Sequence, residues 1–181
     1  KVRAIAVYST FTSSENSEDL LISKATMGEV KYNVEPDAKY PGLSPRELTN
    51  GLQGSVIFIS GRWVGYVGKD LDLTVDLGEV KPIRLISVRT LISAAQWIMP
   101  HRGLYVWVST DGKNFEDIYD LPADPMPANK PDYIDTENVL LPMAKDARYV
   151  RIKMLSEKSM PEWHPHTGKP GWLFVDEVTV E

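Results

Sequence analysis

The sequence predicts an all-β sandwich, because turn residues are frequent, apolar and polar residues alternate, and helical periodicity is scarce. The 181 residues include 13 prolines and 12 glycines, which leave few windows long enough for a regular helix. The segments between them alternate in the way of strands with one buried face. Strands at this spacing without intervening helices are typical of a sandwich or barrel.

The first residues of the chain differ from the rest. Residues 2–8 alternate like a strand, residues 9–18 form a polar linker with four serines, and residues 20–22 are apolar again. We therefore expect residues 1–24 to be the terminal strand and linker of a preceding small β domain. Residues 25–181 then form the sandwich.

One short helical turn is expected at residues 44–47. Ser44 is placed to cap it, Pro45 suits the first helical position, and Glu47 is placed to close a capping box. The turn must be short, because Asn50 and Gly51 end it.

The clearest strand covers residues 71–77, with four apolar residues on one face and Asp72, Thr74 and Asp76 on the other, and Gly78 ends it. Further strands are expected at residues 83–91, 104–109, 148–155 and 173–180. In the strand at 104–109, Val106 and Val108 are expected to face the core, which places Tyr105 and Trp107 on the opposite face. If it is exposed, this aromatic pair is of the kind that marks an interaction surface. The alternative is that a neighbouring strand or domain covers it.

The composition excludes several classes of function. The net charge of −5 comes from interspersed charges without a dense run of Lys or Arg, so nucleic acid is not an expected partner. The sequence has no apolar stretch of roughly 20 residues, so membrane insertion is not expected either. Zero cysteines rule out a disulfide framework, thiolate metal ligands and a cysteine nucleophile.

Independent catalysis is not predicted. Asp176 and Glu177 are adjacent on a predicted strand, so their carboxylates are expected on opposite faces instead of across one cleft. The sequence also lacks a Gly-x-Ser-x-Gly elbow, a phosphate loop and a dinucleotide fingerprint.

The loops between strands carry the residue types that bind sugars. A pyranose ring needs a flat apolar surface for its C–H face and a few polar side chains for its hydroxyls. The candidate carbohydrate-binding residues are Trp63, Tyr66, Gln96, Trp97, His101, Arg102, Trp163, His164 and His166. The alternative is that these tryptophans pack beneath their own loops and seal the end of the sandwich. The three histidines do not have the spacing of a recognised metal motif, so a sugar hydroxyl is their more plausible partner.

An ordered series of segments resembles the discoidin-like domain, also called the coagulation factor 5/8 type C domain. The segments are LTNG (48–51) with GS (54–55), GRW (61–63), DLG (76–78), VSTDGKNF (108–115), RYVRI (148–152), WHP (163–165) and WLFVDE (172–177). The segments WIMP (97–100) and WHP (163–165) resemble the version of this domain found in bacterial family 20 β-hexosaminidases, or chitobiases.

This resemblance implies a jelly-roll β-sandwich of about eight strands, of the discoidin or galactose-binding type. It implies that the chain is a non-catalytic part of a β-N-acetylhexosaminidase, with the catalytic domain as one partner and a glycan of N-acetylhexosamine or galactose type as another. An extracytoplasmic bacterial location is implied in the same way.

The same resemblance implies a structural calcium site. By matching positions, Asn50, Ser55 and Glu177 are its ligands. Asn50 stands where the pattern usually has Asp, which removes one negative charge and weakens the site.

Two functions remain open from the sequence. The first is a carbohydrate-binding module that holds a glycosidase near its substrate. The second is a structural module that packs on the catalytic domain and has no sugar site. The exposure of Trp63, Trp97 and Trp163 distinguishes them, and the sequence does not give it.

Overall fold

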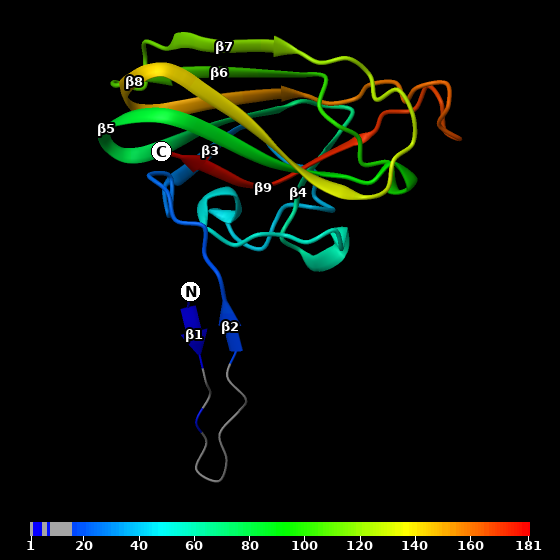
Figure 1. Ribbon diagram of the computed structural model, residues 1–181, viewed down its shortest axis with the longest axis horizontal. Coiled ribbons are helices and arrows are strands. Elements are labelled where there is room, and N and C mark those ends of the chain that lie inside the picture. The colour runs from blue at the N-terminus through cyan, green and yellow to red at the C-terminus, as the bar shows by residue number, and fades with distance from the viewer. Residues whose placement is uncertain (1, 5–6, 8–15) are drawn as a thin grey trace.

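Two long strands form the frame of the molecule. β5 (Leu71–Ile92) and β8 (Tyr133–Leu155) pair antiparallel, from Leu71 opposite Met154 to Ile92 opposite Tyr133. The computed structural model describes residues 2–4, 7 and 16–181 (Figure 1). Because both strands bend sharply, each contributes to both layers of the fold.

The strands form two layers of one antiparallel sheet, with the order β4-β9-β5-β8-β6-β7 and β3 also on β5. In the front layer, β3 (Glu29–Val34) pairs with the first part of β5, while β6 (Gly103–Ser109) joins the last part of β8 to β7 (Glu116–Pro122). In the back layer, β9 (Trp172–Val180) lies between β4 (Val64–Val67) and the second part of β5. The predicted all-β sandwich is confirmed.

The bend of β5 joins two segments that the sequence predicts as separate strands. Residues 71–77 and 83–91 belong to the single strand β5, whose pairing with β8 shifts between Asp76 and Lys81. Gly78 lies within this bend with φ +83, a left-handed conformation that glycine adopts readily. We refer to this bend as the corner.

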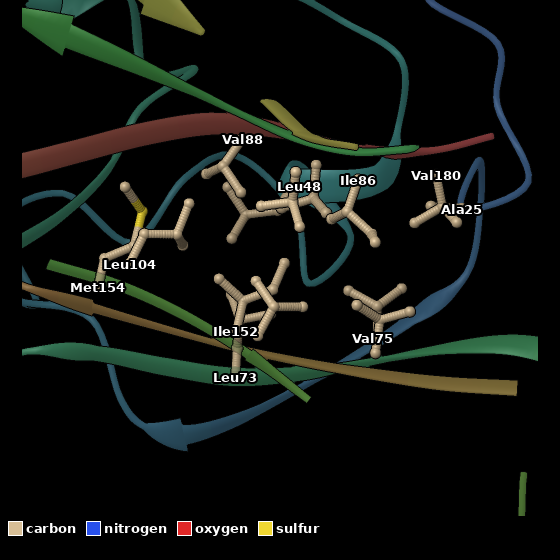
Figure 2. Close-up of a cluster of buried hydrophobic side chains, with 14 of the residues drawn as sticks. Ala25, Leu48, Leu73, Val75, Ile86, Val88, Leu104, Ile152, Met154 and Val180 are labelled. Carbon is tan, nitrogen blue, oxygen red and sulfur yellow. The ribbon is translucent and has the colours of Figure 1, made fainter. Parts of the chain in front are cut away.

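The core lies between the two layers (Figure 2). Leu73 and Val75 of the front part of β5 and Ile86 and Val88 of its back part are all fully buried. This follows from the period of two along a strand, since both halves present their apolar face to the same interior. Val106 and Val108 are buried too, as predicted.

The helices are single turns. They are η1 (Glu47–Thr49), η2 (Phe58–Ser60) and η3 (Ala94–Gln96). The predicted cap by Ser44 is wrong, because η1 begins after Arg46 and has no side-chain cap. The carboxylate of Glu47 instead accepts a hydrogen bond from the Leu43 N–H, at 2.9 Å.

Near the N-terminus, β1 (Val2–Ala4) pairs with β2 (Asn16–Glu18). The end of the predicted polar linker is therefore a strand. The rest of that linker and part of the predicted strand at 2–8 lie outside the described residues, and the domain boundary near residue 24 stays a prediction. The described residues include no helix with the length and apolarity needed to cross a bilayer.

Burial along β8 leads to a first prediction. Ile152 is fully buried in the core, whereas Leu140 on the same strand is 67% exposed. Ile152→Ala leaves a cavity and is expected to lower the free energy of unfolding by about 2–5 kcal/mol. Leu140→Ala is the matched control and is expected to change it by less than about 0.5 kcal/mol. Urea denaturation measures both values, and similar losses in the two variants would contradict this core.

Candidate functional site

Three loops gather at the end of the sandwich opposite the corner. They cover residues 93–102, 123–132 and 156–171, and we call this region the loop end (Figure 1). A cleft of about 380 Å³ opens between them. Its lining residues are Ala94, Ala95, Trp97, Asn129, Trp163, His164, Pro165 and His166. We call it the first cleft.

Trp97 is held in an unusual backbone conformation. It follows η3 with φ +67, in the left-handed region that a bulky residue rarely occupies. Its N–H donates to the Ala94 carbonyl at 2.9 Å, and its carbonyl accepts from the Trp172 N–H at 2.7 Å. These bonds hold the strained residue in place, and strain of this kind clusters at ligand sites. The half-buried indole lies against His166, with 4.2 Å between ring centroids.

Trp163 and His164 form the rigid wall of the first cleft. The Trp163 indole N–H donates to the Met126 carbonyl at 2.8 Å. The His164 Nε2–H donates to the Ala94 carbonyl at 3.0 Å, and its Nδ1 accepts from the His166 N–H at 3.1 Å. Both His164 nitrogens are thus occupied, so this residue cannot donate to a sugar hydroxyl, which corrects its prediction as a sugar ligand. His166 is exposed, and its ring faces Trp97.

A second cleft of about 350 Å³ lies on the other side of Trp97. Gln96 and Trp97 line it together with Tyr40 and Trp172, whose rings meet edge to face at 5.1 Å. Trp97 is therefore a ridge between two clefts. Residues predicted from the sequence to bind sugar line both clefts.

Trp63 and Tyr66, by contrast, lie inside the sandwich, which corrects their prediction as sugar ligands. The Trp63 ring stacks on Phe174, with 6.5 Å between centroids, and its indole N–H donates to the Ser55 carbonyl at 3.0 Å. The Tyr66 hydroxyl donates to the Val34 carbonyl at 3.1 Å, and burial raises the pKa of Tyr66 far above its usual value. Exposed fractions of 1% and 0% leave no surface for a ligand.

His101 and Arg102 tie loops together and do not line either cleft. The buried His101 Nε2–H donates to Glu137 at 3.0 Å, and this bond lowers the pKa of Glu137. The guanidinium of Arg102 donates to Glu157 at 2.8 Å and to the Ala123 carbonyl at 3.1 Å. Their predicted role in binding sugar is therefore replaced by a structural one.

Several cleft residues were not predicted from the sequence, among them Asn129, Tyr40 and Trp172. Asn129 lies in a proline-rich loop, while Tyr40 and Trp172 flank the second cleft. An asparagine in a loop and an aromatic residue at a strand start are too common to signal a site. The aromatic character of Tyr40 was the one available cue.

A second group of candidate site residues surrounds Glu177. β9 has a bulge at Asp176, since Arg89 pairs with Glu177 while Thr90 pairs with Val175. The Gly51 N–H donates to Glu177 at 3.1 Å, and the Gly54 N–H donates to Asp176 at 2.6 Å. Both carboxylates therefore face the same loop, and the prediction that they point to opposite faces is wrong.

These carboxylates are buried and incompletely bonded. Glu47, Asp176 and Glu177 are each at most 1% exposed, and each keeps one oxygen without a hydrogen-bond partner. Burial raises the pKa of Glu177 to about 8, with added repulsion from the other two, and raises that of Asp176 to about 7 against the opposing effect of Arg89. Glu47 and Asp176 were not predicted from the sequence.

The predicted calcium ligands fit this region in part. The partnerless Glu177 oxygen is the kind of hard donor that calcium binds. The Asn50 amide oxygen accepts from the Leu52 N–H at 2.8 Å, and the Ser55 hydroxyl accepts from the Ile57 N–H at 3.2 Å. Across the described residues, no three acidic or histidine side chains converge as a metal cluster. A cation here would therefore depend on loop oxygens as well as on Glu177.

Comparison with known proteins is consistent with this arrangement. The family model described as the F5/8 type C domain matches residues 33–176. No curated protein matches the chain.

Several solved structures are similar at low sequence identity. A fucose-binding module of Streptococcus pneumoniae is 16% identical, with a TM-score of 0.55, 88% of this chain covered and 94% of that one. Chitosan-binding module 1 from a chitosanase/glucanase of Paenibacillus sp. IK-5 is 12% identical, with a TM-score of 0.55 and coverage of 89% and 99%. A Clostridium perfringens module in complex with GalNAc-β-1,3-galactose is 17% identical, with a TM-score of 0.51 and coverage of 84% and 94%.

The raised pKa of Glu177 predicts a specific pH dependence. The folded state keeps the Glu177 proton up to about pH 8, whereas the unfolded chain releases it near the usual glutamate pKa of 4.5. In EDTA, the free energy of unfolding is therefore expected to fall as the pH rises from about 5 to 8, by roughly 1–3 kcal/mol. Glu177→Gln is expected to flatten this slope, while the exposed Glu181→Gln leaves it unchanged. Urea denaturation across this range measures the slope, and an equal slope in Glu177→Gln and wild type would refute the assignment.

Proposed function

This chain belongs to the F5/8 type C domain family, and we propose that it is a non-catalytic carbohydrate-binding module. Domains of this family generally act as accessory modules without catalytic activity. The observation that carries the proposal is the first cleft, where two indole rings and an exposed imidazole surround one opening.

The first cleft offers both parts of a sugar site. Trp97 and Trp163 supply ring surfaces for the C–H face of a pyranose. His166 and Asn129 supply polar groups for its hydroxyls. A shallow site with one or two stacked rings is expected to bind with a dissociation constant on the order of 0.1–1 mM. Weak binding of this kind still serves a tethered enzyme, because it keeps a polymeric substrate at high local concentration.

The two clefts on either side of Trp97 favour a ligand of more than one sugar unit. A terminal sugar in the first cleft and its neighbour in the second would share the Trp97 ridge. We infer a glycan of N-acetylhexosamine or galactose type. The ligands named for the similar modules of Clostridium perfringens and Paenibacillus support a glycan partner.

We further propose that the module is attached to a β-N-acetylhexosaminidase of the family 20 or chitobiase type, outside the cytoplasm of a bacterium. Resemblance of residues 97–100 and 163–165 to such enzymes supports this parent. In that setting the module would hold the catalytic domain near its glycan substrate.

A structural calcium ion is proposed at Glu177. Glu177, with Asn50 and Ser55, would hold it, and the ion would neutralise the buried carboxylates. Its role would be to fasten residues 50–55 to β9, because that loop already donates two amides to the carboxylates.

The alternative function, packing against a neighbouring domain, is favoured by an exposed aliphatic patch. Leu43, Val56, Ile57 and Ile59 are 68%, 45%, 61% and 72% exposed. Exposed apolar residues that gather on one surface are typical of sites that contact another protein or domain. Close by, Arg62 forms an ion pair with Glu18 of β2 at 2.8 Å. Under this alternative, neither loop-end cleft responds to a sugar.

The sugar site is tested with substitutions at two exposed residues of the loop at residues 156–171. His166→Ala removes an imidazole that faces Trp97, and it is expected to weaken binding about 5- to 20-fold through loss of a stacking and hydrogen-bonding partner. Glu162→Ala, in the same loop but outside the cleft, is the matched control. Amide NMR shifts are followed during titration with GalNAc, galactose and chitobiose. If no sugar produces a saturable shift around Trp97 and Trp163, the carbohydrate site is contradicted and domain packing is left as the function.

Calcium is tested by stability at pH 8. Saturating calcium is expected to raise the free energy of unfolding of the wild type by about 2–3 kcal/mol, the value for a ligand at roughly 100 times its dissociation constant. Glu177→Gln is expected to lose most of this gain, and magnesium gives the control for a non-specific salt effect. An equal gain in both proteins would argue against Glu177 as a ligand.

A further inference from the structure

A further cleft lies away from the loop end, on the outer face of the front layer. It has a volume of about 660 Å³, and its floor is formed by outward-facing residues of β5 and β8, including Thr74 and Arg151. β3 forms one wall through Lys31, and the turn between β6 and β7 forms the other through Lys113. In Figure 1 this turn lies at the corner end of the molecule, opposite the loop end.

A smaller cleft of about 330 Å³ continues this space toward the corner. The two clefts share Glu29 and Asp76 in their linings, and the smaller one reaches Gly78 and Lys81 in the bend of β5. We call the two together the front groove. An elongated groove of this kind suits a segment of a chain more than a single compact molecule.

The charge of the front groove opposes that of the whole chain. The protein carries a net charge of −5. The lining of the groove contains three acidic residues, Glu29, Asp76 and Asp111. The basic residues of the lining are twice as many: Lys24, Lys31, Lys81, Lys113, Arg148 and Arg151. Arg148, Arg151 and Lys81 form ion pairs with Asp76, Asp72 and Glu79. Among the described residues, Lys24, Lys31 and Lys113 are the lining cations without such a pair, and they predict an anionic ligand.

Two of the three acidic groups of the groove are engaged in hydrogen bonds, and the exposed Glu29 lies 3.8 Å from the guanidinium of Arg46. Asp76 accepts two hydrogen bonds from the Arg148 guanidinium, at 2.8 and 2.9 Å. Asp111 accepts from the N–H groups of Lys113 and Asn114, both at 2.8 Å, and these bonds lower its pKa. Among the described residues, no acidic side chain forms an ion pair with Lys113, so its charge is available to a ligand.

Next to the groove floor, the front layer carries a pair of aromatic side chains. Arg151 is held by two hydrogen bonds to Asp72, at 3.0 and 2.7 Å, and lies 5.3 Å from the centre of the Trp107 ring. Trp107 in turn stacks on Tyr105, with 6.2 Å between centroids and 14° between planes. This pair lies on the outer face, as the alternation of β6 predicts.

From these observations we propose that the front groove binds an acidic glycan, a sugar chain with carboxylate or sulfate groups, independently of the loop end. Lys31 and Lys113 contact the anionic groups from opposite walls, and Asn33 and Thr74 contact hydroxyls on the floor. A glycan fits better than a nucleic acid, because the basic residues do not form the long continuous series that a phosphate backbone requires. The proposal gives a function to the front groove, which takes no part in the binding of neutral sugars at the loop end.

The test is a titration of the whole chain with a short oligogalacturonate, which carries carboxylates, and with a sulfated oligosaccharide of similar length. Amide NMR shifts are expected at Lys31, Thr74 and Arg151 and to weaken with added salt. The variant with both Lys31→Ala and Lys113→Ala is expected to bind about tenfold more weakly, since each surface charge contributes a few-fold. The control variant carries Lys130→Ala and Lys169→Ala, which removes the same charge from the loop end.

Retained binding in the control and in Trp163→Ala, together with the loss in the groove variant, supports the proposal and separates it from the loop-end site. A stronger response to one oligosaccharide identifies the anionic group. Shifts only at the loop end, equal losses in both double variants, or no saturable shift with either oligosaccharide would overturn it. Equally tight binding of a single-stranded oligonucleotide in the groove would also overturn it, by showing a general polyanion surface.

Discussion

The pairing of β5 with β8 is the contact on which the rest of the structure depends. Both strands start and finish at the loop end, because each runs along one layer, bends at the corner and returns along the other. Ile92 pairs with Tyr133, and Leu155 pairs with Gly103. The loops that leave these positions are therefore brought together, although they lie far apart in the sequence. The position of the loop-end clefts therefore depends on the pairing of β5 with β8 as much as on the residues that line them.

Buried charge is the second constraint on the molecule. Asp176 and Glu177 lie in the most buried strand, and the bulge at Asp176 turns both carboxylates toward residues 50–55. Arg89 offsets only one of them, because its guanidinium donates to Asp176 and to the Gly54 carbonyl. Two buried carboxylates beside one guanidinium are costly in a low-dielectric interior. This imbalance is the physical argument for the calcium ion proposed at Glu177.

The two ends of the sandwich differ in their chemistry. At the loop end, aromatic rings meet nearly at right angles, as Trp97 and His164 do. Few charged residues line the clefts there. At the corner, guanidinium groups are held by carboxylates, and lysines project from the walls of the front groove. Neutral and acidic sugars place different demands on a protein surface, stacking in one case and charge in the other. The pleat of the strands directs alternate side chains to the core and to the outer face, so the strand that buries Leu73 and Val75 also places Thr74 in the front groove.

The sequence by itself determined the class of fold and the faces of its strands, because alternation is a local property of the backbone. Leu73 and Val75 are buried and Thr74 faces outward, as their spacing predicts. It also placed aromatic residues in the loops at 97 and 163. Which aromatic residues reach a cleft was decided by the tertiary structure. Trp63 is buried because Phe174 and the Ser55 carbonyl, from distant segments, pack against it, whereas Trp97 remains at the surface. Contacts between segments far apart in the chain also produce the ion pair of His101 with Glu137 and the bulge at Asp176. No local pattern in the sequence encodes such contacts.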